Sequence, residues 1–149
     1  MHANSGIDFY VLGEPSKQQA WLFACHLIEK TYQQQPIYVH TNSRAEAEQF
    51  DNLLWTYRDD SFLPHCIFEQ DCKDKQHAHP GPPIQIGYGE TPTNLQGILI
   101  NFHRDIPAFY SLFTRVIEIV FADPSVQQLA RERFRQYRNQ GCAMNTHKV

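Results

Sequence analysis

Short apolar runs alternate with amphipathic segments through the first part of the chain. Residues 7–12, IDFYVL, are mostly β-branched or aromatic, which is typical of a strand. From Ser16 onward apolar positions recur at helical spacing, and Ser16 is a suitable N-cap. Residues 37–40 form a second apolar run, and Ser43 caps a second amphipathic segment. This alternation of strand and helix predicts an α/β layered fold.

The middle of the chain holds short apolar segments separated by a polar loop. Residues 61–68, SFLPHCIF, predict a short strand, whereas residues 69–83 are polar and Pro-rich and predict a surface loop. Residues 84–87 and 97–102 predict further strands, the second with the near-continuous apolar character of a strand buried on both faces. Residues 115–120, RVIEIV, are expected to form the last strand.

A long helix near the C-terminal end is the clearest element. Asp123 and Pro124 match an N-cap followed by proline at the first helical position, and Gly141 lies where a C-cap glycine belongs. The apolar residues between them recur at helical spacing, so this face is expected to pack on the sheet. These residues are Val126, Leu129, Ala130, Phe134 and Tyr137.

The length and composition predict one domain, residues 1–149, with a packed core, because 42% of the residues are hydrophobic. No stretch approaches the roughly 20 apolar residues of a membrane span, and the N-terminus lacks the features of a signal peptide. We therefore expect a cytoplasmic protein. In a reducing compartment its four cysteines are expected to be free thiols: Cys25, Cys66, Cys72 and Cys142.

Charge is distributed unevenly along the chain. Residues 1–114 carry thirteen Asp or Glu against seven Lys or Arg, whereas residues 115–149 carry three against six. A nucleic-acid-binding domain usually has an overall basic charge or a long basic stripe, but this chain has a net charge of −3. The distribution favours a local acidic partner for the C-terminal part over a long stretch of DNA or RNA.

Three arginines on the C-terminal helix are the most informative polar pattern. Arg131, Arg135 and Arg138 are spaced to line one side of the helix, beside an apolar shelf formed by Val120 and Phe134. One interpretation is that the stripe is simply the solvated face of the helix. It can also bind an acidic peptide whose apolar terminal residue lies on the shelf. Arginines beside aromatic rings leave direct binding of single-stranded nucleic acid as another interpretation.

A cluster of cysteines and histidines suggests a metal site, but its spacing does not support one. Zinc ligands usually come as closely spaced pairs, and this segment has no C-x2-C pair and lies in a polar loop. We expect no bound metal at the residues concerned: His65, Cys66, Cys72, His77 and His79.

Nucleotide chemistry also lacks a local signature. Gly13, Ser16 and Lys17 resemble a phosphate-binding loop only in part, because the second glycine is missing and Pro15 interrupts the segment. No motif for a nucleophile or a dinucleotide is found either. A nucleotide- or metal-dependent hydrolase remains an alternative, and we expect no catalytic residue and no cofactor.

Trp55 and Phe62 flank an acidic, polar turn in the segment LLWTYRDDSFLPH. Large aromatic residues are most often buried in the core. Because the turn between them is polar, one or both rings can instead lie at the rim of the fold and anchor a partner.

Two blocks of sequence resemble the chi subunit family of DNA polymerase III. LARERFRQYRNQG followed by MNT, within residues 129–146, is similar to the C-terminal helix of the family and the Asn-Thr after it. LLWTYRDDSFLPH, residues 53–65, is similar to a helix end, a Trp and a Ser-Phe-x-Pro-His segment of the family. DFYVL and GILINF lie where the family has strands, so the resemblance spans nearly the whole chain.

The resemblance implies a three-layer α/β/α fold with a mostly parallel sheet and a long C-terminal helix. It implies a non-catalytic replication adaptor that links the clamp loader to the acidic C-terminal tail of single-stranded DNA-binding protein. That tail ends in Asp residues, Ile, Pro and a C-terminal Phe. The site implied for it comprises Val120, Gln127, Arg131, Phe134, Arg135 and Arg138.

Two of these positions depart from the family pattern. Gln127 stands where a lysine is familiar, and Phe134 stands where a tyrosine is familiar. One cation and one hydroxyl fewer predict weaker binding of the tail. The resemblance also implies that the psi subunit of the clamp loader contacts Trp55 and Phe62.

Overall fold

The structure is a computed structural model that describes residues 6–57, 63–67, 83–88 and 97–149, without the side chain of Cys66. Strands and helices alternate in the first part of the chain and again near its C-terminal end. They are β1 (Gly6–Val11), α1 (Lys17–Thr31), β2 (Ile37–His40), α2 (Arg44–Thr56), β3 (His65–Ile67), β4 (Ile84–Gly87), β5 (Ile98–Asn101), the 3-10 helix η1 (Tyr110–Leu112), β6 (Arg115–Val120), α3 (Pro124–Asn139) and β7 (Ala143–Lys148).

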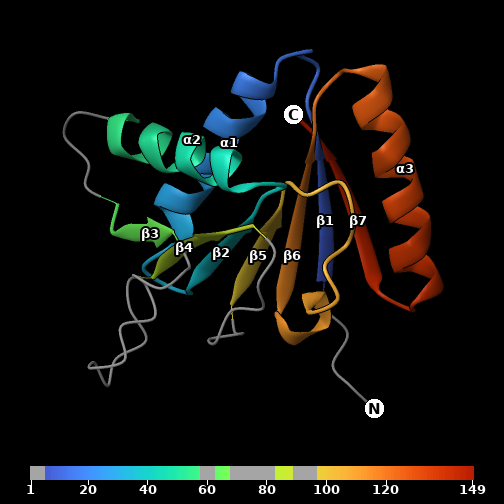
Figure 1. Cartoon of the computed structure of the whole chain (residues 1–149). Coiled ribbons are helices and arrows are strands. Elements are labelled where there is room, and N and C mark those ends of the chain that lie inside the picture. The colour runs from blue at the N-terminus through green and yellow to red at the C-terminus, as the bar shows by residue number, and fades with distance from the viewer. Residues whose placement is uncertain (1–5, 58–62, 68–82, 89–96) are drawn as a thin grey trace.

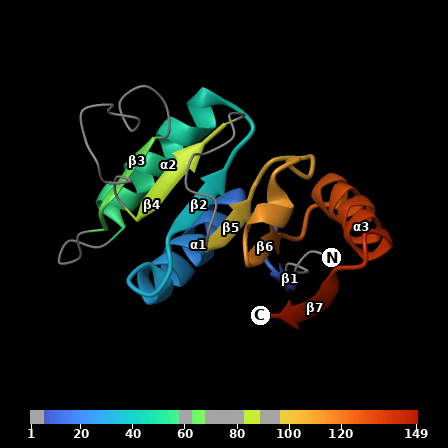
Figure 2. The ribbon, with the colours of Figure 1, turned by 90° about the horizontal axis from the view of Figure 1, so that it is seen from below.

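The strands form one sheet in the order β3-β4-β2-β5-β6-β1-β7, which Figure 2 shows from one edge to the other. Every neighbouring pair is parallel. The expected α/β fold with a mostly parallel sheet is therefore confirmed. Parallel strands need long connections, and α1, α2 and α3 supply three of them.

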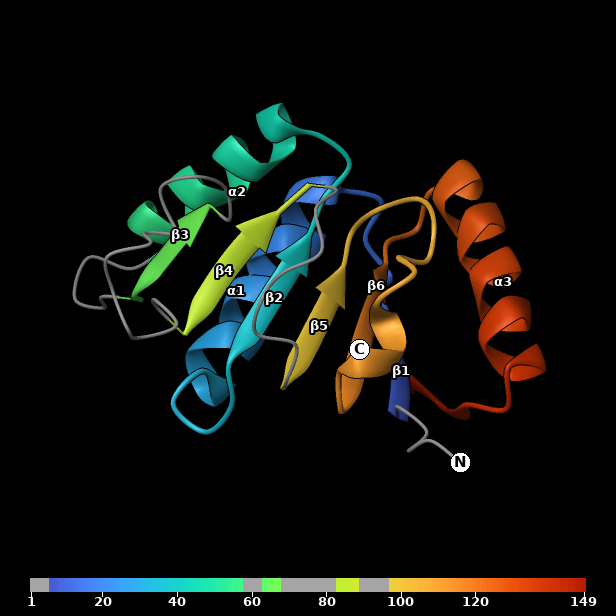
Figure 3. The ribbon, with the colours of Figure 1, turned by 60° about the horizontal axis from the view of Figure 1, so that its bottom comes forward.

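The sheet is covered on both faces, so the three-layer arrangement is confirmed (Figure 3). Successive strand residues point to opposite faces. Val39 and Ile100 belong to an apolar cluster with α1 and α2, whereas Tyr38 and Leu99 belong to another cluster with α3. In Figure 1, α1 and α2 lie together at one side of the molecule and α3 lies at the other.

Local capping explains where the helices begin. The side chains of Ser16 and Ser43 accept hydrogen bonds from backbone amides of the first turns of α1 and α2. Asp123 does the same for α3, and Pro124 follows it at the first helical position. Beyond α3, Gly141 adopts a left-handed backbone conformation with a φ of 84°. This glycine lets the chain leave α3 and return along the sheet.

The expectation that residues 115–120 form the last strand was wrong, because β7 follows α3. This strand pairs in parallel with β1 along its whole length, from Ala143 beside Gly6 to Lys148 beside Val11. Its sequence, AMNTHK, is polar because β7 is an edge strand whose side chains are mostly exposed. The apolar alternation that marks the other strands is therefore absent.

The packed face of α3 also differs from the expectation. Ala130 and Tyr137 are buried as expected, and Val126 and Phe134 are partly buried. Leu129 was placed wrongly, since 38% of its surface is exposed. Helix α3 buries a charged residue, Arg133, on the same face as Ala130 and Tyr137.

Candidate functional site

A pocket of about 230 Å³ lies between α3 and the C-terminal halves of three neighbouring strands. The register of the sheet builds its floor, because Val11 pairs with Val120 and Phe9 pairs with Thr146. Helix α3 supplies the opposite wall. We call it the α3–β7 pocket, and it is lined by Phe9, Val11, Val120, Gln127, Ala130, Arg131, Phe134 and Thr146.

Aromatic contacts hold the apolar part of this pocket in place. The ring of Phe134 lies 5.3 Å from the ring of Phe9, measured between centroids, at a tilt of 60°. The guanidinium carbon of Arg138 lies 6.0 Å from the centroid of Phe134. Phe134 therefore packs on the sheet through Phe9 and lies near the cation of Arg138.

The structure brings four of the six residues implied for the tail site into one pocket: Val120, Gln127, Arg131 and Phe134 line it together. Arg135 and Arg138 are exposed on α3 but do not line the pocket. Within the described residues, none of the three arginines of the stripe forms an ion pair. The stripe therefore presents uncompensated positive charge at and beside the pocket.

Four lining residues were missed by the sequence analysis. Thr146 belongs to β7, which was not foreseen, although the MNT segment that contains it contributes to the family resemblance. Phe9 and Val11 lie in a strand that was foreseen, but the sequence does not show that this strand is a neighbour of β7. The fourth residue, Ala130, was expected only as part of the packed face of α3.

A buried polar network fastens α3 to the sheet beside the pocket. The carboxylate of Glu118, on β6, is fully buried and accepts three hydrogen bonds. The donors are Arg133 Nε at 3.0 Å, Tyr137 Oη at 2.7 Å and Asn101 Nδ2 at 2.9 Å. Burial raises the pKa of Glu118, and the positive charge of Arg133 and the three donors oppose this shift.

The polar network was also missed, although the sequence holds a signal for it. Glu118 is the one charged residue inside the otherwise apolar run VIEIV. A carboxylate inside a strand buried on both faces requires a partner. Arg133 lies three positions after Ala130 and four before Tyr137, on the packed face of the helix.

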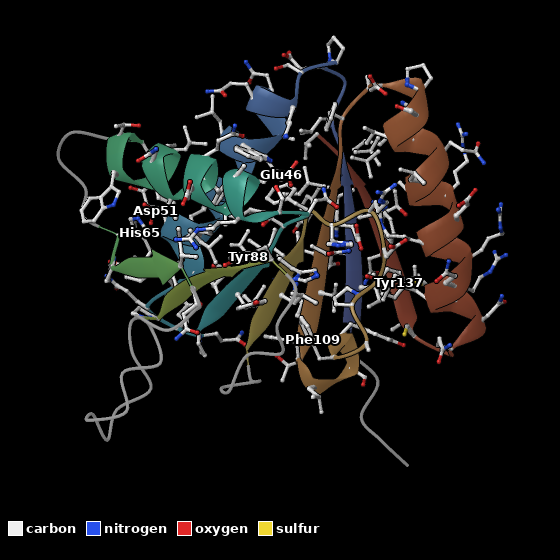
Figure 4. The ribbon with its side chains drawn as sticks, in the orientation of Figure 1. Glu46, Asp51, His65, Tyr88, Phe109 and Tyr137 are labelled. Atoms are coloured by element: carbon white, nitrogen blue, oxygen red, sulfur yellow. The ribbon has the colours of Figure 1, made fainter. Side chains whose placement is uncertain are left out.

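Trp55 lies at the far end of the molecule from α3, and 55% of its surface is exposed. Its ring lies 4.8 Å from the ring of His65, and its indole hydrogen bonds to Asp51. His65 Nε2 lies 3.1 Å from Asp51 Oδ1, and Figure 4 shows these two side chains together between α2 and β3. Burial raises the pKa of Asp51, and His65 opposes the shift. Trp55 is therefore exposed rather than buried in the core, as one of its two interpretations expects, whereas Phe62 lies outside the described residues.

Most residues of the Cys/His segment, for which no metal was expected, lie outside the described part of the chain. His65 is described and is engaged with Asp51 and Trp55. Cys72, His77, His79 and the side chain of Cys66 are not described. Among the residues that are described, no group of three or more His, Cys, Asp or Glu could hold a metal ion.

The remaining expectations concern thiols, membrane segments and Lys17. Cys25 and Cys142 are free thiols, and burial raises the pKa of Cys25 to about 12. No helix in the described ranges is both long and apolar enough to cross a membrane. Lys17, of the partial phosphate-loop pattern, lies 2.9 Å from Glu46 and over the ring of Trp21.

These observations define the class: a parallel α/β protein, covered by helices on both faces, with a small cationic pocket on its surface. A family model described as "DNA polymerase III chi subunit, HolC" matches residues 5–145. The chain therefore belongs to the DNA polymerase III chi subunit family.

Three relatives, each named DNA polymerase III subunit chi, are similar to this chain. The protein of Pseudomonas aeruginosa is 34% identical over 144 residues, which cover 96% of either chain. The protein of Haemophilus influenzae is 29% identical over 144 residues, 95% of this chain and 96% of the relative. The protein of Escherichia coli is 28% identical over 111 residues, 74% of this chain and 71% of the relative.

Proposed function

We propose that this chain is a non-catalytic replication adaptor. In this proposal the α3–β7 pocket binds the acidic C-terminal tail of single-stranded DNA-binding protein. The face around Trp55 and Phe62 binds the psi subunit of the clamp loader, and the protein acts in the cytoplasm as part of the polymerase holoenzyme. Membership of the chi family supports the replication role.

One observation carries the tail-binding part of the proposal. Val120 and Phe134 offer an apolar surface in a pocket that Arg131 also lines. A volume of about 230 Å³ suits one large side chain. A peptide that ends in an aromatic residue after several Asp residues has matching chemistry: its ring enters the pocket, and its carboxylates meet the arginines.

The positions of the three arginines relative to the pocket predict how much each contributes to tail binding. Arg131 lines the pocket, whereas Arg135 lies one turn further along α3 and Arg138 lies over Phe134. Substitution of Arg131 by alanine should therefore weaken tail binding most, by about fivefold, since an exposed ion pair contributes up to about 1 kcal/mol. Arg135→Ala should have a smaller effect and Arg138→Ala the smallest.

A fluorescent tail peptide titrated against each variant tests this ranking. Arg44→Ala is the matched control, because Arg44 is exposed on α2, where it pairs with Glu48, and does not line the α3–β7 pocket. Wild-type affinity should be micromolar and should fall with added salt, because the charges are exposed to screening. Equal affinities for Arg131→Ala and Arg44→Ala would contradict the proposed site.

A second peptide separates the apolar contact from the charges. Replacing the terminal Phe of the tail by Ala should weaken binding more than any single arginine substitution, because the ring is the group that fills the pocket. Phe134→Ala should weaken the original peptide and discriminate less between the two peptides. If both peptides bind alike, the pocket does not hold the terminal ring.

The psi-binding part of the proposal is supported by the exposure of Trp55. An aromatic ring that is 55% exposed and fixed by His65 and Asp51 is a suitable partner anchor. Trp55→Ala should reduce capture of psi, whereas Leu112→Ala should not, although Leu112 is exposed to a similar extent, 53%. Equal capture by both variants would remove Trp55 from the interface.

Direct binding of single-stranded nucleic acid is the competing function. The chain carries a net charge of −3, which opposes association with phosphate backbones. A gel shift with bare oligonucleotide at physiological salt should show no complex. A complex that weakens in Arg131→Ala would favour the competing function.

A further inference from the structure

A second pocket opens on the other flank of α3, at the carboxyl ends of β2, β5 and β6. Its volume is about 210 Å³, and it is more enclosed than the α3–β7 pocket. Both helical layers and the segment after β5 contribute to it. We call it the crevice pocket, and its principal residues are Lys17, Trp21, Phe102, Arg104, Leu129 and Arg133.

The topology of the sheet explains why a crevice forms at this position. After β2 the chain turns to α2 on one face of the sheet, whereas after the neighbouring strand β5 it turns to η1 on the other face. Figure 4 places Glu46, in the first turn of α2, beside this point. Ligands of open parallel sheets bind where neighbouring strands connect in opposite directions.

The walls of the crevice pocket are largely apolar. The rings of Trp21 and Phe102 lie 6.0 Å apart, and Ile119, Phe121 and Val126 extend the apolar lining. Leu129 completes it from α3. Its place in this lining explains why Leu129 is exposed, although its helical spacing indicates a core position.

Three cations and one carboxylate, Glu46, line this space, and the buried carboxylate of Glu118 pairs with one of the cations. Lys17 lies 2.9 Å from Glu46, and Arg133 lies 3.0 Å from the buried Glu118. The guanidinium of Arg104 forms neither a hydrogen bond nor an ion pair within the described residues. The local balance is therefore one positive charge in excess.

Arg133 lines the pocket with a largely buried side chain that keeps a spare donor. Its side chain is only 9% exposed, its Nε donates to Glu118, and its Nη1 donates to the carbonyl oxygen of Arg104. Its remaining nitrogen, Nη2, donates to no atom of the described residues. A buried guanidinium with a spare donor is suited to a carboxylate or phosphate oxygen.

We propose that the crevice pocket binds a small organic anion, consisting of one compact apolar group that carries a single carboxylate or phosphate. The anion pairs with Arg104 and accepts a hydrogen bond from Arg133. The apolar group packs against Trp21 and Leu129. This site is separate from the α3–β7 pocket and is not needed for the proposed adaptor function.

The volume of the pocket favours a small ligand. About 210 Å³ is below the volumes of pockets that hold drug-sized ligands, which start at roughly 300 Å³. Ser16, Ser43 and Asp123 cap the helix N-termini at this edge and already accept hydrogen bonds from amides of the first turns. Recognition of the anion therefore rests on the arginine side chains.

The test uses the full chain and simple probes: phenylacetate, phenyl phosphate, the neutral phenylacetamide and inorganic phosphate. Binding is followed by the NMR shifts of the Trp21 indole and of the backbone amides of residues 102–104 and 126–129. The two aromatic anions should bind with dissociation constants of about 1 mM or tighter. Phenylacetamide and inorganic phosphate should bind at least about tenfold more weakly.

Charge reversal at Arg104 is the decisive variant. Arg104→Glu should abolish these shifts, whereas Arg135→Glu, with the same change in net charge, should retain them. The backbone bonds of Arg104 to Asn42 and Arg133 do not need its side chain, so the fold should survive, and unchanged tail-peptide binding would show this. Leu129→Ala should weaken the aromatic anions several-fold.

Three outcomes would overturn the proposal. One is equal binding of phenylacetamide and phenylacetate. Another is equal binding of phenylacetate to the Arg104→Glu and Arg135→Glu variants. The third is an absence of shifts at the crevice pocket, including the case in which shifts occur only at Phe9 and Thr146 of the α3–β7 pocket.

Discussion

The two flanks of α3 carry pockets of similar volume, about 230 and 210 Å³, but their positive charges are in different environments. At the α3–β7 pocket, Arg131 is exposed and without an ion-pair partner among the described residues. At the crevice pocket, Arg133 is buried against Glu118. Arg131 and Arg133 are thus only two positions apart on one helix, but the first is a surface charge screened by solvent and the second is part of a buried ion pair.

This contrast follows from helical geometry. Residues two positions apart on a helix point in very different directions, whereas residues three and four apart share a face. Arg133 shares the packed face of Ala130 and Tyr137. Arg131 and Arg135 are one turn apart on the exposed side. A sequence of alternating arginines therefore serves two distinct roles.

Among substitutions that compare the two flanks of α3, the largest loss of stability is expected at Arg133. Arg133→Ala leaves the fully buried carboxylate of Glu118 without its cation, and loss of one partner of a buried pair costs about 3–5 kcal/mol. Both pockets should be impaired, because α3 lines both of them. The free energy of unfolding, measured by chemical denaturation, tests the prediction.

Arg135→Ala is the matched control for Arg133→Ala. The side chain of Arg135 is exposed on the same helix, so its loss should change stability by no more than about 0.5 kcal/mol. Glu118→Gln should also be destabilising, since it leaves the buried guanidinium of Arg133 without its carboxylate and replaces one acceptor oxygen by an NH2 donor. Similar stabilities for the variants at 133 and 135 would show that the buried pair does not hold α3.

A second difference concerns how stability depends on pH near the crevice pocket. His40 is buried, and its ring stacks at 4.9 Å on that of His103, which lines the crevice pocket. Burial, together with the nearby His103, lowers the pKa of His40 from 6.5 to about 4. The unfolded chain therefore takes up a proton at a higher pH than the folded protein, so stability falls as the pH drops from 6.5 towards 4.

The expected loss over that range is about 3 kcal/mol, from the 1.36 kcal/mol that each pKa unit represents. His40→Phe should flatten this part of the profile, because phenylalanine keeps the stacking and does not titrate. Comparison with wild type separates the contribution of His40 from that of other groups with a shifted pKa, such as Asp8. Parallel profiles for the two proteins between pH 6.5 and 4 would contradict the assignment.

How far the sequence predicts this fold depends on how clearly each element is marked by apolar residues. Strands β2 and β5 are short but wholly buried, so their apolar runs predict them. Edge strand β7 is polar and exposed, and its stability comes from pairing with β1 rather than from a buried face. A local pattern cannot reveal a strand that is defined by a partner more than a hundred residues away.

The candidate sites show the same limit. The spacing of Arg131 and Phe134 indicates one wall of the α3–β7 pocket, because both lie on one helix. The opposite wall depends on β1 and β7 being neighbours, which is a property of the whole sheet. The crevice pocket was not foreseen, since its residues come from three helices, three strand ends and the segment after β5.

The smallest expected effect in the comparison is at Gln127, which lines the α3–β7 pocket beside Arg131. Gln127→Lys adds a cation at the edge of this pocket. It should strengthen tail binding by about two- to fivefold, because an exposed ion pair contributes roughly 0.5–1 kcal/mol. It should also steepen the salt dependence and leave phenylacetate binding at the crevice pocket unchanged. Titration of the tail peptide at low and high salt measures the gain in affinity. A gain that persists unchanged at high salt would show that the substituted lysine acts through packing rather than charge.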